Sequence, residues 1–110
     1  MLPWVLHHRR EQNAVADACA ELGRARGEFS WKAAYTLSPR DALMLCTDAS
    51  YKSGEAGFGA FVHAFNKDRG SVLVVWAAGI RACCIDNVEA EFEAFEWGLR
   101  SFLRWCQSCL

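Results

Sequence analysis

Apolar residues alternate with small or polar residues in three successive segments of the chain. These are LMLCTD at residues 43–48, AGFGAFVHAF at 56–65 and SVLVVWAAGI at 71–80, with polar, glycine-containing turns at 53–55 and 66–70. A period of two residues predicts strands, and short turns join antiparallel neighbours. The pattern therefore predicts a three-stranded antiparallel meander.

The first of these strands ends on a carboxylate. Alternation places Met44, Cys46 and Asp48 on one of its faces. Asp48 thus continues a face that is otherwise apolar, and we treat it as the first candidate for chemistry.

A long helix is predicted at residues 88–106, because Asp86 and Glu89 resemble a capping box and no proline follows them. At 100° per residue, one apolar stripe contains Val88, Phe92, Phe95, Leu99, Phe102, Leu103 and Cys106. The opposite, solvated face carries Glu89, Glu93, Glu96, Arg100 and Arg104.

Glu91 falls inside the apolar stripe. Burying an ionised carboxylate without a partner costs several kcal/mol. Glu91 therefore either binds a metal ion or lies at the edge of the stripe, where its carboxylate reaches water.

A second helix is predicted near the N-terminus, at residues 11–22, and Gly23 would end it. Its apolar side consists of Val15, Ala18, Cys19 and Leu22. Asp17 lies at the edge of that side, where a solvated helix acid is the simplest interpretation. Residues 25–41 show no sustained period and predict a linker with an aromatic turn around Phe29, Trp31 and Tyr35.

Composition limits the classes of function. The chain has 110 residues, 53% hydrophobic and 23% charged, which fits one small globular domain. It shows neither a continuous membrane-spanning apolar run nor a secretory signal, so we expect a soluble, intracellular protein without a membrane partner. A formal net charge of -1 offers no broad electrostatic attraction for nucleic acid, which would have to be held through metals and a local basic patch.

The six cysteines allow two interpretations. Cys83 and Cys84, together with Cys106 and Cys109, contain enough sulfur for a tetrahedral zinc site. Adjacent cysteines do not easily reach one ion, however, and Cys106 continues the apolar stripe of the helix. Reduced or buried thiols are the favoured interpretation.

The order TDAS, AGFGAFVH, a third strand and AEFEAFEWGL resembles the first half of a ribonuclease H domain, in the form carried by plant retroelement (non-LTR) reverse transcriptases. The resemblance implies a ribonuclease H-like α/β fold. Asp48 and Glu91 match its metal-binding acids, and Gly57, Gly59 and Gly98 match its small residues. Ala49 departs from the pattern, because the family commonly has glycine there.

The N-terminal segment resembles the end of the same domain, with a histidine, an RE-x-N turn and an AD-x-x-A helix. The matching residues are His7, Arg10, Glu11, Asn13 and Asp17. This implies that Asp17 is the final metal-site acid and that His7 assists proton transfer or product release. It also marks Ala49, Ser50 and Asn13 as contacts to nucleic acid.

The chain therefore carries the end of the domain before its beginning. Residues 1–24 resemble the end, 25–41 form the predicted linker, and 42–110 resemble the first half. A junction between rearranged elements and a circular permutation both explain this order. The middle of the family's domain, with its fourth strand and third metal-binding Asp, has no counterpart.

Two functions follow as expectations. The first is binding of an RNA/DNA hybrid and hydrolysis of its RNA strand with Mg²⁺, or Mn²⁺, weak or absent because one acid is missing. The second is a catalytically silent remnant that binds nucleic acid or assembles through an open sheet edge, including with copies of itself.

Overall fold

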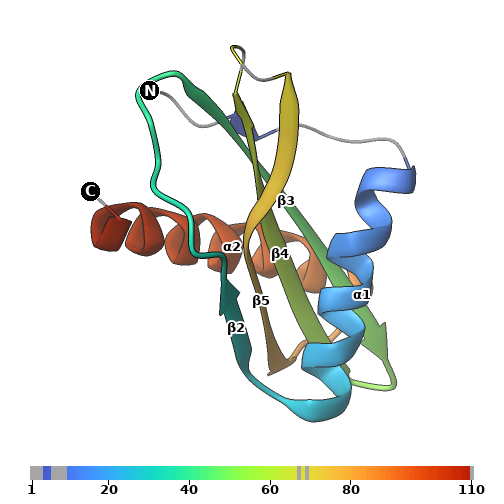
Figure 1. Cartoon of the computed structure of the whole chain (residues 1–110). Helices are drawn as coiled ribbons and strands as arrows, with labels where there is room; N and C mark the ends of the chain where they lie inside the picture. The colour runs from blue at the N-terminus through green and yellow to red at the C-terminus, as the bar shows by residue number, and fades with distance from the viewer. Residues whose placement is uncertain (1–3, 6–9, 67, 69, 110) are drawn as a thin grey trace.

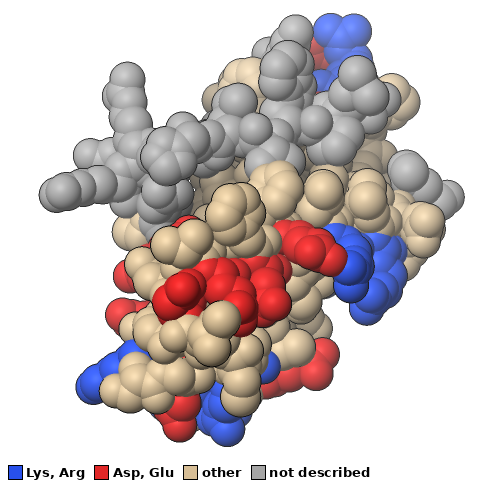
Figure 2. All heavy atoms as spheres, turned by 180° about the vertical axis from the view of Figure 1, so that it is seen from behind, with Lys and Arg blue, Asp and Glu red and all other residues tan. Residues whose placement is uncertain are grey.

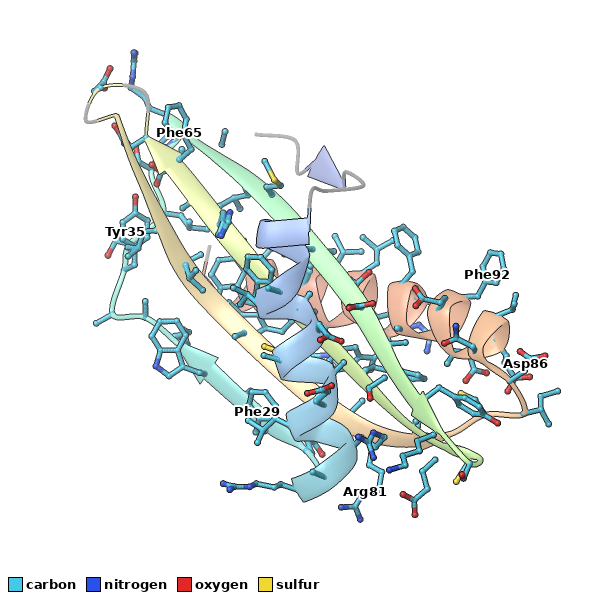
Figure 3. The ribbon with its side chains drawn as sticks, turned by 90° about the vertical axis from the view of Figure 1, so that its right-hand side faces the viewer. Phe29, Tyr35, Phe65, Arg81, Asp86 and Phe92 are labelled. Atoms are coloured by element: carbon cyan, nitrogen blue, oxygen red, sulfur yellow. The ribbon has the colours of Figure 1, made fainter. Side chains whose placement is uncertain are left out.

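The computed structural model describes residues 4–5, 10–66, 68 and 70–109, which form one sheet and two helices. In chain order the elements are β1 (Trp4–Val5), α1 (Arg10–Arg26), β2 (Phe29–Lys32), β3 (Asp41–Lys52), β4 (Glu55–Asn66), β5 (Ser71–Cys83) and α2 (Asn87–Cys109). The sheet order is β1-β3-β4-β5-β2, and only the β1–β3 pair is parallel (Figure 1). Figure 3 shows α1 on one face of the sheet and α2 on the other, so the fold is an α/β/α sandwich.

The predicted meander is confirmed, with longer strands than the sequence pattern indicated. β3 pairs with β4 from Asp41 to Lys52, and β4 continues antiparallel to β5. Ser53 and Gly54 connect β3 to β4 with φ angles of 52° and 85°. Two positive φ angles are typical of a type I′ hairpin, whose twist matches that of the strands it joins. Residues 56–65 are extended throughout, as predicted.

The predicted linker at residues 25–41 is wrong in part, because it contains β2. This strand pairs antiparallel with β5, from Phe29 opposite Gly79 to Lys32 opposite Trp76. Four residues are too few to show a period of their own, and pairing with a distant strand makes them extended.

The segment that follows β2 is anchored by a buried acid. Asp41, only 2% exposed, accepts hydrogen bonds from the Tyr35 hydroxyl at 2.8 Å, the Ser38 N–H at 2.9 Å and the Asn66 side-chain amide at 2.9 Å. A buried carboxylate is tolerated when its oxygens accept such bonds. Asp41 therefore joins this segment to the start of β3 and the end of β4.

The apolar stripe predicted to bury α2 is wrong for most of its members. Val88, Phe92, Phe95 and Leu103 are 64%, 74%, 42% and 48% exposed. The buried side of the helix instead consists of Ala90, Ala94, Gly98, Phe102 and Trp105.

Close packing explains why α2 turns its small residues to the sheet. A Cβ atom at Gly98 would lie 2.4 Å from Thr47 Cγ2 on β3. Small side chains let the helix come near enough to cover Leu43 and Leu45, which belong to one cluster with Phe102. Neither of the helices described at residues 10–26 and 87–109 is long and apolar enough to span a membrane.

α1 is longer than predicted and does not end at Gly23. It runs to Arg26, and Gly27 follows with a φ of 93° and donates its N–H to the Gly23 carbonyl at 2.8 Å. A glycine in this left-handed conformation is a common end to a helix. Gly23 lies inside the helix, where a Cβ would come within 2.6 Å of the Ile80 nitrogen.

The apolar side predicted for α1 is also wrong in part. Val15 and Leu22 are 40% and 39% exposed, whereas Ala16 and Ala20 are fully buried and Cys19 is 7% exposed. The buried face is therefore the face with the smallest side chains.

Glycines on the sheet complete this close approach. A Cβ at Gly57 would lie 2.0 Å from the Ala20 carbonyl oxygen, and one at Gly59 would lie 2.3 Å from the Ala20 nitrogen. A Cβ at Gly79 on β5 would likewise lie 2.6 Å from the Cys19 carbonyl oxygen. The α1 backbone thus rests directly on the backbone of β4 and β5.

We predict that Gly59→Ala destabilises the fold by about 1–3 kcal/mol, because the added methyl group overlaps backbone atoms that cannot move independently. Urea unfolding followed by circular dichroism measures the change. Ser30→Thr adds a methyl group at an exposed position of β2 and should change stability by less than about 0.5 kcal/mol. Equal stability of Gly59→Ala and the unmodified chain would contradict the close packing of α1.

Candidate functional site

Asp48 lies on β3 on the sheet face that α1 covers. Its partner across the ladder is Gly59, the residue over which Ala16 and Ala20 of α1 pass. Asp17 follows Ala16 on the helix, close enough to Asp48 to raise the pKa of Asp48. Two acids from separate elements, α1 and β3, thus come near each other because α1 docks on the glycines.

The environment of Asp48 favours its protonated form. Partial burial is the largest cause and raises the pKa of Asp48, and the neighbouring Asp17 raises this pKa further through charge and hydrogen bonding. The N–H of Ala49, which donates to Asp48 Oδ1 at 2.9 Å, acts in the opposite direction. When both carboxyl groups are ionised, their repulsion can be relieved by a bound cation.

A hydroxyl and a guanidinium lie next to this pair. Ser50 is two residues beyond Asp48 on β3, and its Oγ accepts a hydrogen bond of 2.9 Å from Arg24 Nε on α1. Arg81 of β5 donates to the carbonyls of Arg24 and Ala25 at 2.9 and 3.0 Å (Figure 3). The C-terminal end of α1 therefore brings Arg24 and Arg81 together.

The other predicted residues fall into different places. Ala49 points its side chain into the cluster beneath α2 and is 9% exposed, so only its backbone borders the site. Asn13 belongs to α1, but its side chain lies outside the described part of the structure, as does the whole of His7.

Glu91 lies on α2 and is exposed, so the expectation that it sits within a buried stripe is wrong. Among the described residues, Asp17, Asp48 and Glu91 do not form a group whose ligand atoms all lie within 4.8 Å of one another. If Asp48 and Glu91 share one hydrated Mg²⁺, as the resemblance implies, their carboxyl groups lie within about 8 Å of each other, and this stays a prediction.

A second group of potential ligands was not found from the sequence. Cys84, Glu89 and Glu93 place their ligand atoms within 4.8 Å of one another, at the start of α2. The Cys84 thiol donates to Glu93 Oε2 at 3.3 Å, and burial, followed by Glu93, raises the pKa of Cys84 to about 11. The sequence signal was a cysteine just ahead of two acids one helical turn apart. Within the described residues, Cys106 takes no part in this group, contrary to the zinc interpretation.

Comparisons of the chain with protein-family models, with curated proteins and with solved structures gave no match. The case for a function therefore depends on the residues and geometry given above.

We predict that Asp17→Asn lowers the pKa of Asp48, because the substitution removes a neighbouring negative charge. Carboxyl-carbon NMR signals followed through a pH titration give this pKa directly. Glu21→Gln makes the same change of charge on α1 and should leave Asp48 almost unaffected, because Glu21 is not among the groups that shift it. An unchanged Asp48 pKa in Asp17→Asn would contradict the pairing.

We also predict that Asp48→Asn increases the free energy of unfolding at pH 7. A carboxyl group whose pKa is raised on folding stabilises the fold fully below its unfolded pKa and loses that contribution as pH rises through the folded pKa. The advantage of the variant should therefore shrink toward zero as pH falls below about 3.9. Thermal unfolding at several pH values measures this difference in the free energy of unfolding. A difference that grows as pH falls would contradict the prediction.

Proposed function

We propose that this chain is a ribonuclease H-like domain that binds an RNA/DNA hybrid and hydrolyses its RNA strand with Mg²⁺, slowly at best. The observation that carries the proposal is the docking of α1 over Gly59, the cross-strand partner of Asp48, which brings Asp17 near Asp48. The sequence resemblance pairs these two acids, and two separate segments of the chain bring them together.

The two acids fit a divalent cation. Carboxylate oxygens are the ligands that Mg²⁺ and Mn²⁺ prefer. The ion pairs found among the described residues, Arg40–Asp68 and Arg100–Glu96, involve neither Asp17 nor Asp48, so within this part of the chain no basic side chain is found in an ion pair with these two acids. Bound there, Mg²⁺ would activate water and stabilise the charge that develops at a phosphodiester.

The remaining roles belong to the chain's own residues. Asp48 and Asp17, with Glu91, would hold the metal. Ser50 and Arg24 lie on the same face and offer a hydroxyl and a guanidinium to phosphate or to a ribose 2′-hydroxyl. His7 is assigned proton transfer or product release by the resemblance alone.

Activity is expected to be low because the family's third metal-binding Asp has no counterpart. Groups that act as a unit lose most of their effect when one is removed. A loss of about 4 kcal/mol in transition-state stabilisation corresponds to roughly a thousandfold in rate.

The docking of α1 favours a circularly permuted domain over a junction between rearranged elements. Its buried face fits the glycines of β4 and β5, with backbone atoms of the two layers in direct contact. A helix carried over by chance would have no reason to match that surface.

A silent remnant that assembles through an open sheet edge is the second candidate, and one observation favours it. β1 covers only Met44 and Leu45 of β3. Within the described residues, positions 46–52 of β3 have no strand on that side, and such an edge can pair with another chain.

We predict that Mg²⁺ shifts the carboxyl-carbon NMR signals of Asp17 and Asp48 and that a labelled RNA/DNA hybrid is bound and slowly cleaved in its presence. Asp48→Asn should abolish both the shifts and the cleavage. Asp68→Asn, which removes an exposed acid paired with Arg40, should change neither.

Absence of a Mg²⁺-dependent shift at Asp17 and Asp48 would overturn the metal site and the proposed hydrolysis with it. Binding of Mg²⁺ and hybrid without detectable cleavage would instead identify the silent remnant.

A further inference from the structure

Three potential metal ligands that the proposed hydrolysis does not use meet between the end of β5 and the start of α2. Cys84 follows the last residue of β5, and Glu89 and Glu93 lie four residues apart on α2. Their ligand atoms, one from each side chain, all lie within 4.8 Å of one another. Zinc holds sulfur and oxygen ligands at about 2.0–2.3 Å, so atoms this close to one another can share one ion after small adjustments.

Local hydrogen bonds at the start of α2 place these side chains. Asp86 caps the helix by accepting the Glu89 N–H at 2.8 Å, and Glu89 accepts the Ile85 N–H at 3.3 Å. This reciprocal capping turns the side chain of Glu89 back toward the segment that carries Cys84. Glu93, four residues further along, lies on the same side of the helix as Glu89. The capped helix therefore directs two carboxyl groups toward one thiol.

Cys84 is the buried member of the group and donates its thiol into it. The residue is 7% exposed, and its Sγ lies 3.3 Å from Glu93 Oε2. The titratable groups that act on Cys84 are Glu93, Glu89 and Cys83, all of them acidic. A buried sulfur among acids differs from a cysteine that only fills apolar space. A cation would balance the charge of these groups and bind the sulfur as a thiolate.

The surface around the group attracts cations. Residues 87–98, the first half of α2, contain Glu89, Glu91, Glu93 and Glu96 and neither lysine nor arginine. Figure 2 shows acidic side chains gathered together on one side of the molecule. Carboxylates close together on a surface raise the local concentration of divalent cations.

We propose that Cys84, Glu89 and Glu93 bind one zinc ion, with water in the fourth position. The sulfur ligand decides between metals, because thiolate suits Zn²⁺ whereas Mg²⁺ and Ca²⁺ take oxygen ligands. Cys83 is exposed, and adjacent cysteines do not easily reach one ion, so the fourth position is left to water. Three protein ligands and a water are typical of zinc sites that stay open to other molecules.

The zinc site has consequences for the folded chain that do not involve the proposed hydrolysis. Binding releases the thiol proton of Cys84 to solvent, because the thiolate is the form that binds the metal. The ion joins the end of β5 to the start of α2, so zinc stabilises the folded state. The group lies at the end of α2 where Figure 3 labels Asp86, on the other face of the sheet from α1. It therefore holds or fails independently of the Asp17 and Asp48 site.

Calorimetric titration of the reduced chain with Zn²⁺, in the presence of a competing chelator, measures the affinity. We expect one zinc per chain. Cys84→Ser and Glu93→Gln should each weaken binding at least about tenfold, since even the groups that orient a metal ligand contribute that much. Cys83→Ser and Glu96→Gln make the same changes at exposed neighbouring positions and should leave the affinity almost unchanged.

Circular dichroism confirms that each variant folds, and Glu93→Gln changes an exposed side chain that the fold does not depend on. A chain that binds no zinc overturns the proposal. Folded Cys84→Ser and Glu93→Gln variants that bind zinc as tightly as the unmodified chain also overturn it.

Cobalt(II) in place of zinc tests the sulfur ligand directly, because a thiolate bound to Co²⁺ gives a charge-transfer absorption in the near ultraviolet. This band should appear in the unmodified chain and in Cys83→Ser and be absent from Cys84→Ser, and excess Mg²⁺ should not remove it. Asp48→Asn should leave the band unchanged, which separates this site from the proposed hydrolysis. A band that persists in Cys84→Ser would assign the metal to other cysteines and contradict the proposal.

Discussion

The structure depends on the direct contact between the backbone of α1 and the backbone of β4 and β5. Gly57, Gly59 and Gly79 provide this contact from the sheet, and Ala16 and Ala20 provide it from the helix. Larger side chains would lift α1 away from the sheet. The contact fixes both the height and the register of the helix, and it joins the first part of the described chain to strands that follow much later.

This register has an electrostatic consequence. With Ala16 and Ala20 held over Gly59, Asp17 lies near Asp48, and its charge adds to partial burial in raising the pKa of Asp48. The arrangement works against stability at neutral pH. Residues placed for function are often not the ones that stabilise the fold.

α2 differs from α1 because large apolar side chains lie both on its buried face and on its exposed face. Its small residues and two large aromatic side chains, Phe102 and Trp105, pack on the sheet, while Phe92 and Leu103 remain exposed. The sheet cannot bury both faces of one helix. The second face, together with the part of β3 that β1 does not cover, gives the molecule surfaces suited to association.

The sequence by itself determined the strands β3, β4 and β5, the turn at Ser53 and Gly54, and the start of α2 after Asp86, whose carboxylate accepts the Glu89 N–H at 2.8 Å. These features depend on local periodicity and local hydrogen bonds, which neighbouring residues specify. Only the tertiary structure decided which face of each helix is buried, because hydrophobicity favoured Val15 and Phe92 while the space above the sheet admitted only Ala16 and Ala90. The proximity of Asp17 to Asp48, the strand β2 and the grouping of Cys84 with Glu93 likewise depend on residues far apart in the chain. Such contacts follow from how closely two backbones can approach, which no local pattern records.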